Sequence, residues 1–512
     1  MSGEPTRRTA RWIALTAFLV YALGGGGRIV GSDEVSMYQL ARSMLRGRID
    51  VPAGATLAGR DGHAYTKNAA AQAVLALPLV AAGEAAARVL PLAPARRPLL
   101  ARVPASLFNA IVSAILLAAF FRLARALGLG PGTALAATLL LGFTTPLWVY
   151  AKSFMAEPLQ GLGLLLALGG AARAGAGEER AGRTAALGVL LAVSAKLSML
   201  PLALACLVPL GRRLGRWALP LAGLGAALAG HLAYNLARFG APLETGYGSQ
   251  ATLAAYSTPL LVGLYGLLFS SGKGLMWFAP ALWLAPAGFG AMRWAGSGGG
   301  AQNAAAAGAA RGIAAAWLVG FTLYGTFQHW AGDGSYGPRY LVPLLPLGLL
   351  AVAFAPYQAT RARRLLAWAL ALAGLFVQVG GVTIYFGAQM REAGDYPYTR
   401  PLGDPRFMSE SHFNPWFNPV VASWRMLARN AGEHLRGEFP RLGGGGEADA
   451  RLGVPAAEVP GLLHGLDFWW AYAGYAGVSP AAILALVAAL LAACAWSVVR
   501  LRAALVAEAR GP

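Results

Sequence analysis

The stretch that decides the fold class is RRTARWIALTAFLVYALGGGGRIVGSDE, residues 7–34. Its apolar part, residues 12–30, has the length that a helix needs to cross a bilayer. Three arginines precede this part, and the acidic pair Asp33 and Glu34 follows it. Because basic residues favour the cytoplasmic side of a membrane, the sequence predicts a cytoplasmic N-terminus and places the acidic pair on the outer face.

The acidic pair has two interpretations. A carboxylate at the mouth of a membrane bundle is costly to desolvate, so such residues usually serve binding or catalysis. The alternative is local, since Ser32 or Asp33 would also cap a helix that begins near Glu34, and the first turn of a helix favours acidic residues. The sequence leaves both interpretations open.

The composition of the whole chain is that of a polytopic helical membrane protein. Of its 512 residues 57% are hydrophobic and 12% are charged, and the mean hydropathy is +0.52, which excludes an ordinary soluble enzyme. The net charge of +20 comes from 42 basic residues, only four of them lysine, against 22 acids. The arginines cluster between apolar segments, as they do in inner loops that face anionic lipid, so no nucleic-acid partner is expected.

Cysteines and the N-terminus give two further expectations. Cys206 and Cys494 both lie in apolar runs, so neither a disulfide framework nor a cysteine metal site is implied. The N-terminus has the charge pattern of a signal peptide, but a glycine run, residues 24–27, stands where a cleavage site would be. The first span is therefore predicted to stay uncleaved.

Arginine-rich turns between the apolar segments mark the inner face and give a topology. Alternating the direction of the segments around these turns predicts an all-α protein of the cell (inner or plasma) membrane, with about twelve transmembrane helices, outer loops and juxtamembrane helices. The predicted spans are 12–30, 102–121, 132–150, 157–172, 184–199, 200–211, 216–237, 275–292, 312–328, 340–356, 365–386 and 480–499. Residues 69–92 are also apolar enough to cross, but counting them would reverse every later loop, so we expect them in the outer interface.

The same topology divides the chain into three parts. Residues 1–386 form the main transmembrane module, which includes a first outer loop at 31–101. An outer segment follows at 387–479, rich in Trp, Tyr, Pro and Arg, and residues 480–512 form the last span and a basic cytoplasmic tail. Residues 296–312 are mostly Ala and Gly and are expected to be a flexible inner loop without chemistry.

Isolated charged residues collect on the outer side in this topology, whereas arginine dominates the inner loops. The outer set consists of Asp33, Glu34, Lys67, Lys152, Glu157, Lys196, Glu244, Lys273, Asp333 and Arg339. This distribution predicts an outward-facing polar cavity among the helices. The histidines have no metal-ligand spacing, so a metal site is not indicated.

Several of these residues also have purely structural interpretations. Glu157 is followed by proline, a pattern typical of a helix start. Lys196 and Arg339 lie close enough to a span end to reach the interface by extending their side chains. Arg339 also follows a glycine-rich turn, and a fixed guanidinium suits bidentate phosphate binding. Lys273 lies between glycines and suits a phosphate contact, although the full P-loop pattern is missing.

Several stretches of the chain together resemble the C-type glycosyltransferases. The stretches are the acidic pair after the first span, MYQLARSML (37–45), DGHAYTK (61–67), the acid Glu157, residues 238–248 and 270–277, and YGPRYLVP (336–343). Members of this family are polytopic enzymes that use polyprenyl-phosphate sugars, and they include protein mannosyltransferases and the lipid A aminoarabinose transferase. The likeness covers residues 12–386.

The resemblance implies roles for the outer charged residues. Asp33 would be the base that activates the acceptor hydroxyl, with Glu34 as its neighbour and Glu157 as a second acid. Lys67 and Arg339 would lie near the lipid phosphate. Family members often have prolines after the lysine, where this chain has Asn68 and Ala69. The other residues assigned to substrate or phosphate binding are Lys273, Lys196, Tyr336, Asp333 and Glu244.

The implied reaction is an inverting transfer of a sugar from a polyprenyl-phosphate donor to a hydroxyl of a glycan, lipid or protein on the outer face. A positioned base contributes roughly 10²–10⁴-fold to such a reaction. No cofactor is required and a divalent cation is optional, because fixed cations also stabilise a departing phosphate. The alternative function is a transporter or flippase of lipid-linked glycans, which often has repeated halves and broken helices at mid-membrane. A third alternative is a non-catalytic assembly factor.

Overall fold

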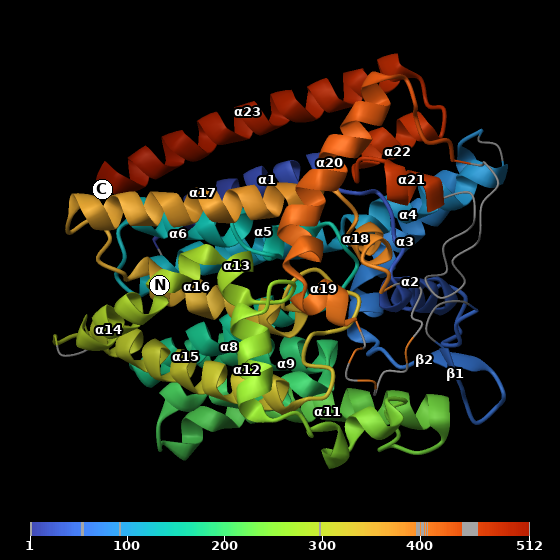
Figure 1. The fold of residues 1–512 in the computed structure, drawn as a ribbon. Helices are drawn as coiled ribbons and strands as arrows, with labels where there is room; N and C mark the ends of the chain where they lie inside the picture. The colour runs from blue at the N-terminus through green and yellow to red at the C-terminus, as the bar shows by residue number, and fades with distance from the viewer. Residues whose placement is uncertain are drawn as a thin grey trace.

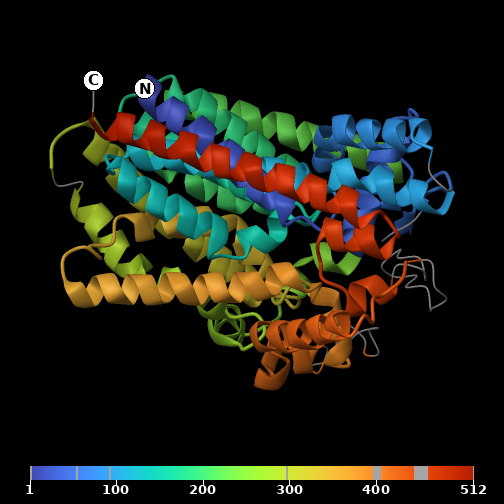
Figure 2. The ribbon, with the colours of Figure 1, turned by 90° about the horizontal axis from the view of Figure 1, so that it is seen from above.

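The computed structural model describes residues 3–52, 56–91, 94–295, 298–395, 400, 404, 406, 408–442 and 459–510. The structure is 74% helical, and within these residues the strands form one two-stranded hairpin, so the all-α prediction is confirmed. Long helices run side by side, and both chain termini lie at the same end of the bundle (Figures 1 and 2). The first and last helices meet there, because the Thr6 hydroxyl donates a 2.7 Å hydrogen bond to Glu508.

The first half of the chain supplies the centre of the bundle and the hairpin. Its elements are α1 (Glu4–Leu23), α2 (Ser32–Met44), β1 (Thr56–Ala58), β2 (Ala64–Thr66), α3 (Ala71–Val89), α4 (Arg97–Ser106), α5 (Phe108–Ala126), α6 (Pro131–Phe143), α7 (Leu147–Ala151), α8 (Glu157–Gly175), α9 (Ala181–Ala195), α10 (Leu200–Cys206) and α11 (Ala218–Phe239). The two strands are antiparallel, with Leu57 opposite Tyr65.

The second half adds flanking helices and the predicted outer segment. Its elements are α12 (Leu260–Phe269), α13 (Leu275–Phe278), α14 (Ala285–Ala295), α15 (Ala301–Thr326), the 3-10 helix η8 (Arg339–Leu344), α16 (Leu345–Ala353), α17 (Arg361–Thr383), α18 (Phe386–Glu392), α19 (Ser409–Phe413), α20 (Pro419–Leu435), α21 (Val459–His464), α22 (Trp469–Tyr475) and α23 (Pro480–Arg510).

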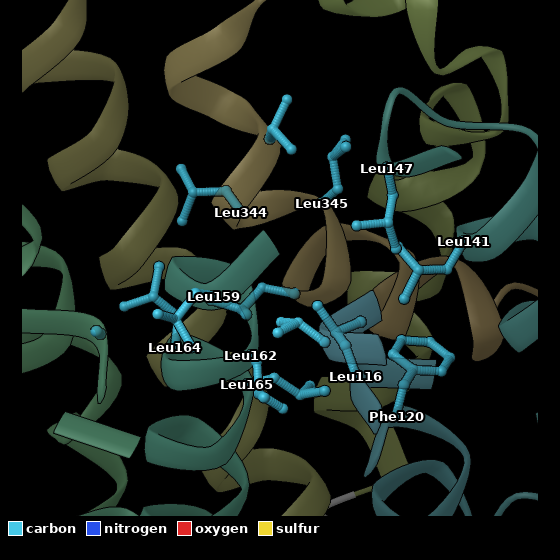
Figure 3. Close-up of a cluster of buried hydrophobic side chains, with 14 of the residues drawn as sticks. Leu116, Phe120, Leu141, Leu147, Leu159, Leu162, Leu164, Leu165, Leu344 and Leu345 are labelled. Carbon is cyan, nitrogen blue, oxygen red and sulfur yellow. The ribbon is translucent and has the colours of Figure 1, made fainter. Parts of the chain in front are cut away.

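Helix α8 lies at the centre of the hydrophobic core. Nearly all of its residues are buried, as expected for a helix that is apolar on every side. Figure 3 shows its leucines, among them Leu159 and Leu165, meeting Leu116 and Phe120 of α5 and Leu344 of η8. The two ends of α8, at Glu157 and Gly175, lie at opposite ends of the bundle.

Small residues allow α8 and α9 to pack closely. A Cβ atom at Gly188 of α9 would lie 2.2 Å from the backbone nitrogen of Ala167, and one at Gly163 of α8 would lie 2.5 Å from that of Ala192. Any side chain at these positions would push the two helices apart. This is the small-residue packing that membrane helices use, since lipid offers no hydrophobic driving force between them.

Six helical stretches within the described residues are long and apolar enough to cross a membrane. They are Ala71–Val89, Arg97–Ala126, Leu214–Phe239, Ala301–Thr326, Arg361–Thr383 and Pro480–Arg510. Several predicted spans are interrupted instead. The predicted span 132–150 divides into α6 and α7, and 275–292 divides into α13, a 3-10 turn and α14.

The first predicted span is shorter than expected. Helix α1 ends at Leu23, whereas the prediction ran to residue 30. The glycine run 24–27 explains the difference, because glycine has a high entropic cost in a helix and Gly27 adopts a positive φ of 63°. Residues 24–30 therefore form an irregular connection that leads into α2.

The flexible inner loop predicted at 296–312 is wrong over most of its length. Helix α15 begins at Ala301, directly after Gly300 with a φ of 104°. The reason is composition, since alanine has the highest helix propensity and the alanines of this stretch outnumber its glycines. Residues 296 and 297 lie outside the described part of the chain.

The end of the bundle away from the termini carries the additional elements. Helices α2, α3 and α4 and the β1–β2 hairpin lie there, and so do α21 and α22 (Figure 1). Helix α3, which covers most of residues 69–92, packs against α2 and α4. The predicted outer segment 387–479 is partly outside the described residues, and its described part contains α18 to α22.

Candidate functional site

The start of α2 presents Asp33 without using it as a cap. The N-cap is Gly31, whose N–H donates a 2.7 Å hydrogen bond to Oε2 of Glu34. The other carboxylate oxygen of Glu34 accepts from the backbone N–H of Phe154. Glu34 thus closes the helix end and attaches it to the chain before α8, while the Asp33 side chain remains available for other contacts.

Arg339 joins two carboxylates that are far apart in the sequence. Its Nη2 lies 3.0 Å from Oδ2 of Asp33, and its Nε lies 2.5 Å from Oε1 of Glu157. Asp33 comes from the first turn of α2, Glu157 from the first residue of α8, and Arg339 from the first residue of η8. The structure therefore brings together Asp33 and Arg339, as the sequence led us to expect, and adds Glu157 to the pair.

The charges around Asp33 keep its carboxylate ionised. Burial raises the pKa of Asp33, but the positive charges of Arg339 and Lys67 outweigh this effect and lower the pKa from 3.8 to about 2. Asn68 adds a weaker contact, with its side-chain nitrogen 3.4 Å from Oδ1 of Asp33. At neutral pH the site therefore holds a negative charge on Asp33.

These residues line a small polar cavity of about 70 Å³. Its lining includes Asp33, Glu157 and Arg339 as well as Lys67 and Lys196. The same two lysines also line a neighbouring cavity of about 260 Å³, which is bordered by the aromatic side chains Tyr256, Tyr324 and Phe327 and by polar residues of α11. A polar cavity and a partly apolar one thus adjoin at the lysines.

Lys67 and Lys196 are the cations of this site without an acidic partner. Among the described residues, neither has a carboxylate oxygen within 4.0 Å, and each contacts a ring instead: Lys67 lies 5.2 Å from the centre of Tyr247, and Lys196 lies 5.0 Å from that of Tyr340. Arg339, by contrast, is already paired twice. An anionic ligand would therefore find its free positive charge at the lysines.

Two buried polar atoms of the cavity also lack partners within the described residues. They are Oε2 of Glu157 and Nε2 of Gln160, one turn further along α8, and both side chains are 2% exposed. Buried polar groups in folded proteins are almost always hydrogen-bonded. An unpaired acceptor and donor on one cavity wall are what a bound polar ligand would satisfy.

The hairpin and α11 hold Lys67 in place. The Thr66 hydroxyl, which precedes Lys67, donates a 3.1 Å hydrogen bond to Ser36 of α2, and the carbonyl of Thr66 accepts from the buried guanidinium of Arg238. Lys196 is held differently, since it ends α9 with an extended backbone. The two lysines thus reach the cavity from rigid supports.

Other residues predicted for the site lie elsewhere or act structurally. Tyr336 is buried and its hydroxyl donates to the carbonyl of Val377 at 3.0 Å. Lys273 donates to the carbonyls of Asp333 and Ser335 at 2.9 and 2.6 Å, and so fixes the loop before Arg339. Glu244 accepts from the N–H of Gly246 in an exposed turn. None of these three side chains lines the cavity around Asp33.

Asp333 lines the cavity as predicted, in an unusual backbone conformation. Its φ is 51°, in the left-handed region that few residues other than glycine adopt. Its Oδ1 lies 3.4 Å from Nδ1 of His329, which lines the same cavity. His329 was not expected from the sequence, because the histidines there show no spacing that points to a shared site.

A second buried ionic cluster was also missed from the sequence. Asp467, just before α22, accepts from Nε of Arg28 at 2.5 Å and lies 2.9 Å from Nζ of Lys152. The Tyr472 hydroxyl donates to the same carboxylate at 2.9 Å. This cluster ties the irregular segment 24–30, which leads into α2, and the end of α7 to the C-terminal part of the chain.

Neither a metal site nor a known protein adds to the description of the site. Among the described residues, no group of three His, Cys, Asp or Glu side chains is arranged to hold a metal ion. Comparisons with protein-family models, with curated proteins and with solved structures found no match to this chain.

Proposed function

We propose that the protein is a glycosyltransferase that moves a sugar from a polyprenyl-phosphate donor to a hydroxyl acceptor on the outer face of the membrane. The observation that carries the proposal is the cavity in which the Asp33 carboxylate faces two lysines without acidic partners. An acid for the acceptor and cations for a phosphate thus share one small space, and a partly apolar cavity adjoins it. The resemblance to C-type glycosyltransferases supports the same activity.

The proposed topology keeps twelve spans with a cytoplasmic N-terminus. Five of the twelve proposed spans coincide with long apolar helices, and the shorter apolar helices α6 and α9 lie in two others, while α3 stays in the outer interface. An even number of crossings would return the chain to its starting side, which agrees with the pairing of Thr6 and Glu508. The rise of an α-helix places Arg173 about 24 Å from Glu157 along α8, close to the hydrocarbon thickness of a bilayer. The Asp33 cavity would then open at the outer surface.

The donor would bind where the two cavities adjoin. Its phosphate would lie against Lys67 and Lys196, and the start of its prenyl chain would follow the larger cavity past Tyr256 and Phe327. The rest of the chain would lie in lipid beside α11, whose leucines Leu232 and Leu236 are exposed. Prenyl chain and sugar need different surroundings, and this position at the membrane edge supplies both.

The transfer itself would need a group that accepts a proton and fixed positive charges that stabilise the departing phosphate. The acceptor oxygen attacks the anomeric carbon as the bond from that carbon to the phosphate oxygen breaks, which inverts the configuration. Asp33 takes the proton that the acceptor hydroxyl loses. The lysines stabilise the charge that develops on the departing phosphate, a preorganised electrostatic effect that is often the largest contribution to catalysis.

The low pKa of Asp33 fits this role once the donor is bound. A carboxylate with a pKa of about 2 is a weak base, because proton transfer is most efficient when the pKa lies near the working pH. A phosphate beside Lys67 would offset part of the positive charge that lowers this pKa. Donor binding would therefore make Asp33 a stronger base at the moment when it is needed.

The test is the mass analysis of cell-envelope glycans from cells with and without the chain, followed by complementation with Asp33→Asn. The proposal expects a sugar residue to be lost without the chain and not to be restored by Asp33→Asn. Asp50→Asn is the matched control, because Asp50 lies in the same outer loop and pairs with Arg48 outside the cavity. Unchanged glycans, or full restoration by Asp33→Asn, would rule out the proposed mechanism.

A reconstitution separates transfer from transport, the alternative function. Purified protein in liposomes that contain a prenyl-phosphate sugar and a hydroxyl acceptor should form a glycosidic product. Movement of the lipid-linked sugar between leaflets without any product would favour a transporter or flippase instead.

A further inference from the structure

A third cavity lies at the opposite end of the bundle, where the chain termini meet. Its volume is about 740 Å³, and it is bounded by the ends of α5 and α8 and by the starts of α1, α9 and α15. Thr6 of α1 and Arg173 of α8 both line it, so α8 separates it from the Asp33 cavity. By the charge rule this end faces the cytoplasm.

The rim of this cavity is strongly basic. Arg122, Arg125, Arg173 and Arg180 line it, against one acid, Glu178. Two of the arginines have partners, since Arg125 pairs with Glu508 at 2.7 Å and Arg173 pairs with Glu178.

The other two arginines are left with uncompensated charge. Within the described residues, Arg122 and Arg180 have no carboxylate oxygen within 4.0 Å, and the charges of Arg7 and Arg173 act against that of Arg122. Both residues are exposed, so their guanidinium groups are open to a ligand at the rim. A bound anion would find positive charge there that no described carboxylate compensates.

The interior of the cavity is apolar rather than basic. Leu123, Leu165 and Leu166 line it together with Gly169 and Gly170. A free inorganic anion would gain nothing from such walls. A molecule with an anionic head and a hydrocarbon tail matches both the rim and the interior.

We propose that this cavity binds the head of an anionic phospholipid of the inner leaflet, with its phosphate at Arg122 and Arg180 and the first part of its acyl chains against the leucines. Basic pockets between transmembrane helices on the cytoplasmic side bind such headgroups in other membrane proteins. The volume lies within the range of small-molecule sites, so it accommodates a headgroup with its glycerol and not a complete lipid. The site is independent of the glycosyl-transfer proposal.

The experiment measures lipid retention by the full-length protein in mixed micelles of phosphatidylglycerol and phosphatidylcholine, by native mass spectrometry. The wild type is expected to retain phosphatidylglycerol. Each basic residue near an anionic lipid contributes roughly fivefold to binding, so Arg122→Gln with Arg180→Gln should weaken retention by about 25-fold. The matched control is Arg361→Gln with Arg363→Gln, which removes two exposed arginines from the start of α17.

A second variant tests the site without changing its charge. Ala301 is exposed at the start of α15 and lines the cavity, so Ala301→Trp should obstruct it and displace the lipid while every arginine remains. This variant keeps the test valid even if the arginine double variant folds poorly.

Several results would overturn the proposal. Equal retention by wild type, the arginine double variant and Ala301→Trp would place the lipid elsewhere. Equal retention of phosphatidylcholine would show that charge is not recognised. Displacement of phosphatidylglycerol by micromolar glycerol phosphate would identify a soluble phosphate compound, and not a lipid, as the occupant.

Discussion

Replacing Arg339 by glutamine should destabilise the protein through the two carboxylates that Arg339 now joins. Asp33 and Glu157 would lose their shared cation, and both are largely buried, with side-chain exposures of 18% and 2%. Removing one member of a buried ion pair typically costs about 3–5 kcal/mol, because the remaining charge is left without compensation. We expect Arg339→Gln to lower the stability by an amount in this range.

The pKa of Asp33 gives a second estimate of the stability that would be lost. A pKa lowered from 3.8 to about 2 corresponds to about 2.5 kcal/mol of stability at neutral pH, of which Arg339 is the main source. Because folding lowers the pKa of Asp33, its contribution to stability is present above pH 3.8 and is lost as the pH falls toward 2. It is therefore fully present under ordinary conditions, and Arg339→Gln should remove most of it at pH 7.

Cys206 provides the assay. It is fully buried in α10, so a thiol-reactive dye labels it only when the bundle opens, and Cys494→Ala removes the other cysteine, which is partly exposed. In this background the labelling midpoint temperature of Arg339→Gln should fall well below that of Arg361→Gln, which removes an exposed arginine. Adding Glu157→Gln to Arg339→Gln should restore part of the loss, since it neutralises the more buried carboxylate.

Two results would refute this reasoning. If Arg339→Gln labels at the same midpoint as Arg361→Gln, Arg339 does not compensate the two acids. If Glu157→Gln brings no recovery in the Arg339→Gln background, the loss comes from packing and not from an unpaired buried charge.

Two further predictions concern the buried groups that support the site. Asp467→Asn should lower the Cys206 labelling midpoint, because it leaves Arg28 and Lys152 buried without a negative charge, and Lys152→Met should partly restore it; no recovery would contradict the ionic role of the cluster. Burial lowers the pKa of Lys273 from 10.5 to about 7, although the charge of Asp333 acts in the opposite direction. Between pH 7 and 10.5 the unfolded chain therefore binds more protons at Lys273 than the folded protein does. The stability of the folded protein should rise with pH across that window. Thermal unfolding followed by tryptophan fluorescence should show this rise in the wild type and a flatter profile in Lys273→Met; equal profiles would rule it out.

Part of the candidate site was predictable because each residue carried a local signal. Asp33 follows a hydrophobic segment, Glu157 precedes a proline at a helix start, and Arg339 follows a glycine-rich turn. These signals mark the ends of helices, and the ends of antiparallel helices in a bundle meet. The contact between Asp33 and Arg339 could therefore be expected, although they are 306 positions apart.

The roles within the site could not be separated in the same way. Asp33 and Glu34 are adjacent acids, yet one faces the cavity and the other closes the end of α2, because neighbouring residues on a helix point in different directions. Arg339 suited a phosphate by its sequence, but it pairs with two carboxylates, and the proposed function therefore gives that task to Lys67 and Lys196. Only the packing of the helices decides which charges pair.

The sequence by itself determined the all-α class of the protein, and the number and length of its apolar segments are those of a helical membrane protein whatever their arrangement. It also determined helix starts such as that of α8, where Glu157 precedes a proline, because backbone propensity is a local property. The tertiary structure alone decided that Arg28, Lys152 and Asp467 form one buried cluster and that arginines at the ends of α5 and α8 and the start of α9 surround one cavity. The physical reason is that charge pairing and cavity shape depend on distances between helices, and these distances are set by side-chain packing that no local pattern records.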